Sequence, residues 1–124
     1  MAEIVLIEDD PAVQRVIRRA LAVGGHTVDA FENGRGAIDH LRSADPDLLI
    51  TDIFMPEMEG IETIQRVRAL KPHLTIIAIS GFMFGSADYL EIAEKFGAIA
   101  TLKKPFRPAE LLELVSRLLS EQRC

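Results

Sequence analysis

Residues 4–11 read IVLIEDDP, and this stretch decides the fold. Four aliphatic residues in a row, rich in β-branched side chains, are typical of a strand buried on both faces of a parallel sheet. Asp10 and Pro11 then start a helix, with Asp10 as the N-cap and Pro11 as the first helical residue. The stretch is therefore predicted to be a strand that passes through acidic residues into a helix.

The same strand-to-helix unit is predicted five times along the chain. After residues 4–7, apolar strands are expected at 27–31, 48–51, 75–79 and 98–102. The segments between them carry apolar residues at helical spacing and are bounded by glycine or proline. Short apolar strands that alternate with amphipathic helices predict an α/β fold, a doubly wound five-stranded parallel sheet with helices on both faces.

Glycine and proline predict where the helices begin and end. Gly24 and Gly25 end the first helix, and Pro108 opens the last one. A loop at 56–60 precedes the third helix, and Gly60 is expected there at a positive φ angle. The third helix is marked by Ile61, Ile64, Val67 and Leu70, and a fourth helix, which ends at Gly97, carries Tyr89, Ile92, Ala93 and Phe96.

The composition predicts one compact domain over residues 1–124, because 48% of the residues are hydrophobic. A net charge of −5 disfavours a general affinity for nucleic acid or for an anionic membrane surface. No apolar run is long enough to span a membrane, and the N-terminus does not resemble a signal peptide. The single cysteine, Cys124, allows no internal disulfide, so we expect a cytoplasmic protein.

Chemically distinctive residues stand at the ends of four predicted strands. Glu8 and Asp9 follow the first strand, Asp52 the third, Ser80 the fourth and Lys104 the fifth. Carboxyl ends of parallel strands meet at one edge of the sheet, and ligands of such sheets bind there. Three clustered carboxylates repel one another unless a cation lies among them, and Mg²⁺ prefers such oxygen ligands.

This group has the parts of a phosphoryl-transfer site. Asp52 is the candidate nucleophile, since a carboxylate can accept a phosphoryl group. Ser80 and the backbone amide of Gly81 could bind phosphoryl oxygens, and Lys104 could supply a point charge. Each residue alone also fits an ordinary role in a cap, a turn or the solvated end of a strand. Lys103 competes with Lys104, because alternation along a strand lets only one of them face the site.

The ordered set of motifs IVLIEDD, LLITDIFMPEMEG, IIAISG and LKKPF resembles the receiver domain of bacterial two-component response regulators over nearly the whole chain. The resemblance implies a flavodoxin-like (βα)5 fold and a phosphorelay protein. It also implies that Glu8, Asp9 and the carbonyl of Phe54 bind Mg²⁺ and that Asp52 is the phosphoacceptor. Ser80 and Lys104 would contact the phosphoryl group, and the Lys104–Pro105 bond is often cis in the family.

One position departs from the family pattern. Receivers usually carry Tyr or Phe three residues before the lysine, as a switch, whereas this chain has Thr101. Our hypothesis is that Phe82, Phe84 or Tyr89 reports the phosphorylated state instead. The alternative is that these aromatic residues only pack against the edge of the sheet.

The resemblance implies a histidine kinase or a histidine phosphotransfer protein as phosphodonor, an unidentified downstream protein partner, and a possible homodimer. Arg15, Arg18 and Arg19 are interpreted as a solvated helix face, or as a surface that touches an acidic kinase. We expect a stand-alone receiver that is not an enzyme beyond its own phosphorylation and dephosphorylation. The alternatives are a receiver fragment of a DNA-binding regulator or hybrid kinase, and an Asp-nucleophile phosphatase, which would need a second acid where Phe54 stands.

Overall fold

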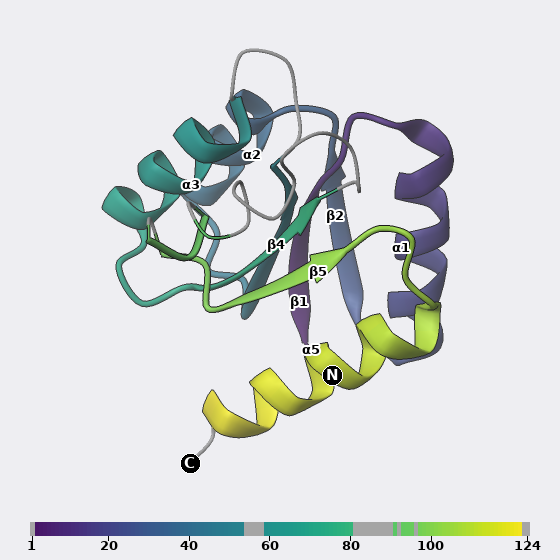
Figure 1. The fold of residues 1–124 in the computed structure, drawn as a ribbon. Helices are drawn as coiled ribbons and strands as arrows, with labels where there is room; N and C mark the ends of the chain where they lie inside the picture. Colours follow the sequence, from purple (N-terminus) through teal and green to yellow (C-terminus); the bar gives the residue numbers. More distant parts are fainter. Residues whose placement is uncertain (1, 54–58, 81–90, 92, 96, 123–124) are drawn as a thin grey trace.

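The computed structural model describes residues 2–53, 59–80, 91, 93–95 and 97–122 (Figure 1). Within these residues five parallel strands form one sheet in the order β2-β1-β3-β4-β5, which confirms the predicted doubly wound α/β fold. The strands are β1 (Glu3–Ile7), β2 (Thr27–Phe31), β3 (Leu48–Asp52), β4 (Thr75–Ser80) and β5 (Ala100–Lys103). The helices with complete bounds are α1 (Pro11–Val23), α2 (Gly34–Leu41), α3 (Glu59–Leu70) and α5 (Pro108–Gln122).

The sheet has a separate hydrophobic core on each face, because successive side chains of a strand point to opposite sides. Val5 and Ile7 of β1 belong to the core under α2 and α3. Ile4 and Leu6 belong to the core under α1 and α5. Figure 1 shows these two pairs of helices on opposite faces of the sheet. Strands β1, β3 and β4 are therefore buried on both sides, as their continuous apolar runs predict.

The strand order places the ends of β1 and β3 side by side. Ile7 pairs with Thr51 in the parallel ladder, so the residues that follow each of them leave the sheet at the same level. The chain continues from β1 outward to β2 on one side, and β3 begins the other half of the sheet. This is the point where a doubly wound sheet opens a crevice at its carboxyl edge.

Side-chain caps fix the starts of α1 and α2. Asp10 has an extended backbone conformation, and its carboxylate accepts hydrogen bonds from the amides of Ala12 and Val13, which confirms it as the N-cap. Asn33 plays the same part for α2 by accepting from the amide of Gly36 at 3.0 Å. The first cap sets the direction in which α1 leaves the acidic end of β1.

The prediction for Gly60 was wrong. Gly60 is helical, in the first turn of α3, and among the described glycines the positive φ angles belong to Gly25 and Gly97. A Cβ at residue 60 would lie 2.7 Å from the carbonyl oxygen of Ile53 and 2.8 Å from its carbonyl carbon, with the Cα closer still. Glycine is therefore required here by the close approach of α3 to the chain that leaves β3, and not by backbone conformation.

One predicted boundary also differs from the structure. β5 begins at Ala100 rather than at residue 98, because the amide of Ala98 still donates to the carbonyl of Ala93 as the preceding helical turn ends. Leu70, the last of the apolar residues that mark the third helix, is 37% exposed because α3 ends there. Of the fourth predicted helix, Ala93 is fully buried, while Tyr89, Ile92 and Phe96 lie outside the described residues.

Across the part of the chain that the structure describes, no helix combines the length and apolar character needed to cross a membrane.

Candidate functional site

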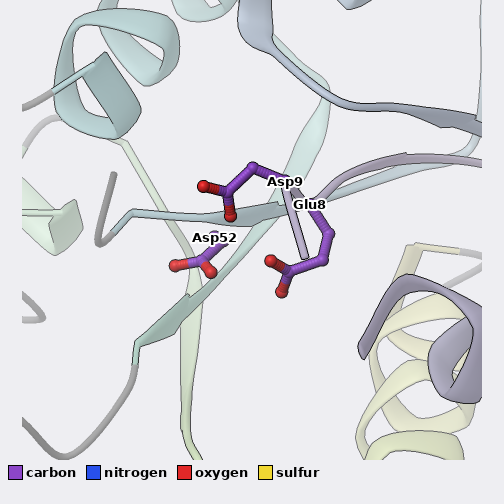
Figure 2. A group of neighbouring side chains, drawn as sticks. All are labelled: Glu8, Asp9 and Asp52. Atoms are coloured by element: carbon purple, nitrogen blue, oxygen red, sulfur yellow. The ribbon is translucent and has the colours of Figure 1, made fainter. Parts of the chain in front are cut away.

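Three carboxylates converge at the carboxyl edge of the sheet. Glu8 and Asp9 follow β1, and Asp52 is the last residue of β3. Carboxylate oxygens of all three lie within 4.8 Å of one another, and Figure 2 shows the side chains turned toward a shared space. Glu8 and Asp52 are buried, with exposed fractions of 1% and 4%, whereas Asp9 is exposed. The predicted acid group is therefore assembled in the structure, open to solvent on the Asp9 side.

Lys104 joins this group from the end of β5. Its ammonium Nζ donates to Oε1 of Glu8 at 2.7 Å and to Oδ2 of Asp52 at 2.8 Å. Its backbone amide donates to the carbonyl of Ser80 at 2.7 Å, which ties the end of β5 to the end of β4. Lys103 is exposed, so the structure assigns the site-facing position to Lys104. The Lys104–Pro105 bond is cis, as the resemblance implies.

Burial and charge together set the protonation of the group. Burial raises the pKa of Glu8 from 4.5 to about 7, and the nearby Asp52 charge adds to the rise, against the hydrogen bond from Lys104. Burial alone would lower the pKa of Lys104, but hydrogen bonds to Asp52 and Glu8 outweigh it, so the pKa is raised. Lys104 therefore stays charged at neutral pH and compensates part of the negative charge around it.

Backbone contacts hold Glu8 in place. Its amide donates to the carbonyl of Phe31 at 3.0 Å, and its Oε2 accepts from the amide of Asp10 at 3.1 Å. The carboxamide of Gln14 donates to the carbonyl of Glu8 at 3.1 Å and to that of Phe31 at 3.4 Å. Sequence reasoning missed Gln14. The sequence does hint at its role, because Gln14 is a polar residue three positions before Ile17, on the side of α1 that carries the buried apolar residues.

The remaining predicted site residues fall into two groups. Ser80 is the last residue of β4 and is fully buried beside the acid edge. Thr101 lies in β5 opposite Ala78, two residues before the level of Ser80 and Lys103. The other predicted residues lie outside the part of the chain that the structure describes: Phe54, Gly81, Phe82, Phe84 and Tyr89.

The donor set fits a hard divalent cation. Three carboxylates offer oxygen ligands, and Lys104 compensates only one of their charges. The open Asp9 side gives an ion or a phosphate group access from solvent. Together with a nucleophilic carboxylate and a buried hydroxyl, such a pocket can neutralise a phosphoryl group and position it for in-line transfer.

Comparisons with known proteins agree with this chemistry. A family model described as the response regulator receiver domain matches residues 4–116. The response regulator receiver protein CpdR of Brucella abortus is 35% identical over 119 residues, which cover 96% of this chain and 98% of CpdR. The DNA-binding transcriptional regulator NtrC of Escherichia coli is 35% identical over 115 residues, which cover 93% of this chain but 24% of NtrC. The chain thus spans about a quarter of the length of NtrC.

A solved structure shows the same arrangement of elements. The receiver domain of sensor histidine kinase PA1611 from Pseudomonas aeruginosa PAO1 superposes with a TM-score of 0.85 at 27% identity, covering 96% of this chain and 98% of that domain. That structure has a magnesium ion coordinated in its active site cleft. The family model matches most of the chain, and the matched span contains the three acids and Lys104, which contacts two of them. The chain therefore belongs to the response regulator receiver domain family of two-component systems.

Proposed function

We propose that this chain accepts a phosphoryl group on Asp52 from a phosphohistidine, with Mg²⁺ held by Glu8, Asp9 and Asp52. One observation carries the proposal: the Asp52 carboxylate lies within 4.8 Å of the other two acids and 2.8 Å from Nζ of Lys104. A carboxylate in such a pocket, next to a compensating ammonium, is placed to act as a nucleophile. The carbonyl of Phe54 is proposed as a backbone ligand of the ion.

The transfer step needs no reactant other than the phosphohistidine and the carboxylate of Asp52. An Asp52 oxygen attacks phosphorus, the new P–O bond forms, and the N–P bond breaks with its electron pair going to the histidine nitrogen, which then takes up a proton. Bound Mg²⁺ supplies charge neutralisation for the acids and the phosphoryl oxygens. Lys104 and the hydroxyl of Ser80, with the amide of Gly81, are proposed to bind the oxygens of the transferred group.

Phosphorylation changes the charge that Lys104 and Ser80 meet. An aspartyl phosphate carries about one more negative charge than the carboxylate, and it has new acceptor oxygens. We propose that Lys104 and Ser80 follow these oxygens and shift the segment after β4 between two conformations. Phe82, Phe84 and Tyr89 of that segment remain our switch candidates, because Thr101 replaces the usual aromatic residue.

The donor is proposed to be a histidine kinase or a histidine phosphotransfer protein that docks over α1 and the segment between β5 and α5. An apolar groove of about 360 Å³ runs there from Val16 and Ile17 to Phe106, and Lys104 lines its end. Val16 is 54% exposed, which leaves an apolar side chain available to a partner next to the site. A protein seated in this groove would bring a phosphohistidine close to Asp52.

The output of the switch is proposed to be a protein contact, in a cytoplasmic receiver whose domain spans residues 1–124. Both leading alternatives for the whole protein stay open, since the chain resembles CpdR over nearly its full length and a quarter of NtrC. A phosphatase with an Asp nucleophile is the weaker candidate, because the residue two positions after Asp52 is Phe54 and not an acid. We therefore propose no turnover of other substrates.

Phosphorylation by a small donor tests the proposal without a cognate kinase. The protein is incubated with acetyl phosphate, with and without Mg²⁺, and its intact mass is measured. We expect the wild type to gain one phosphoryl group only with the metal, and the Asp52→Asn variant to gain none. An unmodified wild type in the presence of Mg²⁺ would contradict the proposal, as would equal labelling of Asp52→Asn.

A further inference from the structure

Three arginines of α1 have no carboxylate partner among the described residues. Arg18 and Arg19 lie three and four residues after Arg15, which puts the three side chains on one side of the helix. None of them lies within 4.0 Å of a described acid, whereas Arg42 and Arg66 pair with acids of their own helix or its end. Such unpaired clustering is notable in a chain of net charge −5.

The three side chains line a hollow of about 350 Å³ between α1 and the edge strand β2. Ala22, His26 and Val28 complete its walls, and no described carboxylate lines it. The volume lies at the lower end of the range for small-molecule sites, which begins at about 300 Å³. We call this hollow, with its six lining residues, the arginine hollow.

His26 adds a neutral hydrogen-bond donor to the wall. Its Nδ1 accepts from the amide of Ala2 at 3.2 Å, so the ring proton is on Nε2. Burial lowers the pKa of His26, with the nearby N-terminal charge contributing, so the ring is neutral at physiological pH. The positive charge of the hollow therefore comes from guanidinium groups, which remain charged at any physiological pH.

We propose that the arginine hollow binds a small ligand that carries a chain of phosphate groups, such as a nucleoside di- or triphosphate. Guanidinium groups are planar forks that bind phosphate oxygens in pairs, and three of them side by side match successive phosphates. The apolar walls at Ala22 and Val28 and the His26 ring offer contact to the rest of such a ligand. The hollow's size favours a small ligand over an acidic protein surface.

This site is separate from the acid group. His26 and Val28 lie at the amino end of the sheet, just before and within the start of β2, whereas Asp9 and Asp52 lie at its carboxyl edge. The arginines follow α1 from its second turn toward that amino end. Ligand binding at the arginine hollow and phosphorylation of Asp52 can therefore succeed or fail independently, and each has its own test.

The test uses inorganic tripolyphosphate and ATP in metal-free buffer, so that neither is drawn to a bound cation. Binding is measured by titration calorimetry and mapped by amide chemical shifts in the full chain. The test variant is Arg15→Gln/Arg18→Gln/Arg19→Gln. Its control, Arg35→Gln/Arg107→Gln/Arg117→Gln, removes the same charge from exposed arginines elsewhere. Oligoglutamate serves as an anion without phosphate.

We expect both phosphate ligands to shift amides of residues 15–28, and the test variant to bind at least about tenfold more weakly than the control. Tighter binding of ATP than of tripolyphosphate would show that the nucleoside also contacts the walls, and equal binding would show that the phosphates suffice; both results support the site. The proposal is overturned if test and control variants bind alike, if oligoglutamate binds as tightly as tripolyphosphate, or if the shifts map to residues 52 and 104.

Discussion

Replacing Lys104 with methionine removes the ammonium between Glu8 and Asp52 but keeps a side chain of similar length. At an effective dielectric of 20, each contact of 2.7 or 2.8 Å carries about 6 kcal/mol of attraction before desolvation is subtracted. Removing one member of a buried ion pair costs about 3–5 kcal/mol net, because the remaining charge is left uncompensated. Protonating Glu8 at pH 8 costs only about 1 kcal/mol in the folded protein, because its pKa is already raised to about 7, but it leaves the buried charge of Asp52 uncompensated.

We therefore expect Lys104→Met, in metal-free buffer at pH 8, to unfold roughly 10–20 °C below the wild type. Lys103→Met is the matched control, because Lys103 is the exposed neighbour on the same strand, and its melting temperature should change little. Differential scanning calorimetry measures both. Mg²⁺ should restore much of the loss, since a cation at 100 times its dissociation constant stabilises the fold by about 2.7 kcal/mol.

The rise of the melting temperature with Mg²⁺ should thus be larger in Lys104→Met than in the wild type, where the ammonium competes for Glu8 and Asp52. Equal melting temperatures for Lys104→Met and Lys103→Met without metal would show that the Lys104 ammonium does not stabilise the acid group. So would a Mg²⁺ response that is smaller in Lys104→Met than in the wild type.

Three further outcomes follow from the structure. Gly60→Ala should destabilise the fold by about 1–3 kcal/mol in urea unfolding, because the new Cβ meets the backbone of Ile53. A stability gain of up to about 1 kcal/mol would contradict this, because it would show that the higher helix propensity of alanine outweighs the close approach to Ile53. Since the pKa of Glu8 is raised from 4.5 to about 7, the folded metal-free protein binds this proton more tightly than the unfolded chain. The wild type should therefore lose up to roughly 3 kcal/mol relative to Glu8→Gln as pH rises from 4.5 to 7 in urea titrations, and parallel pH profiles would contradict this. Val16→Glu should lower kcat/KM for phosphotransfer from a histidine kinase about tenfold but leave labelling by acetyl phosphate unchanged. The control Ile99→Asp, at another exposed apolar residue, should alter neither quantity. Equal effects of the two variants would exclude docking at the α1 groove.

The sequence predicts the fold and the acid group because both follow from local patterns. Alternating apolar runs and amphipathic segments determine a parallel sheet, and topology then brings Glu8 and Asp52 to one edge. The Asp10 cap is equally local, since it bonds to amides two and three residues ahead. Alternation along a strand predicts only that one of Lys103 and Lys104 faces the site, and the structure shows that it is Lys104.

Contacts between distant segments could not be predicted in this way. The need for glycine at position 60 depends on how closely α3 passes Ile53, which no periodicity encodes. Gln14 reaches the carbonyl of Phe31, 17 residues away, across the gap between two strands. Arg68 donates to the carbonyl of Gly97 at 2.7 Å, 29 residues away, and so joins the end of α3 to the chain before β5. Each depends on the packing of elements whose positions are set only by the finished fold.

The position of the phosphoryl group on the chain decides whether Asp52 is the phosphoacceptor. Protein labelled by acetyl phosphate and Mg²⁺ is treated with borohydride, which reduces the labile acyl phosphate to a stable alcohol that marks its position. The protein is then digested and sequenced by tandem mass spectrometry. We predict modification of Asp52 alone, in the peptide that contains residues 48–53. Modification of Asp9 or Asp10 with an unmodified Asp52 would contradict it.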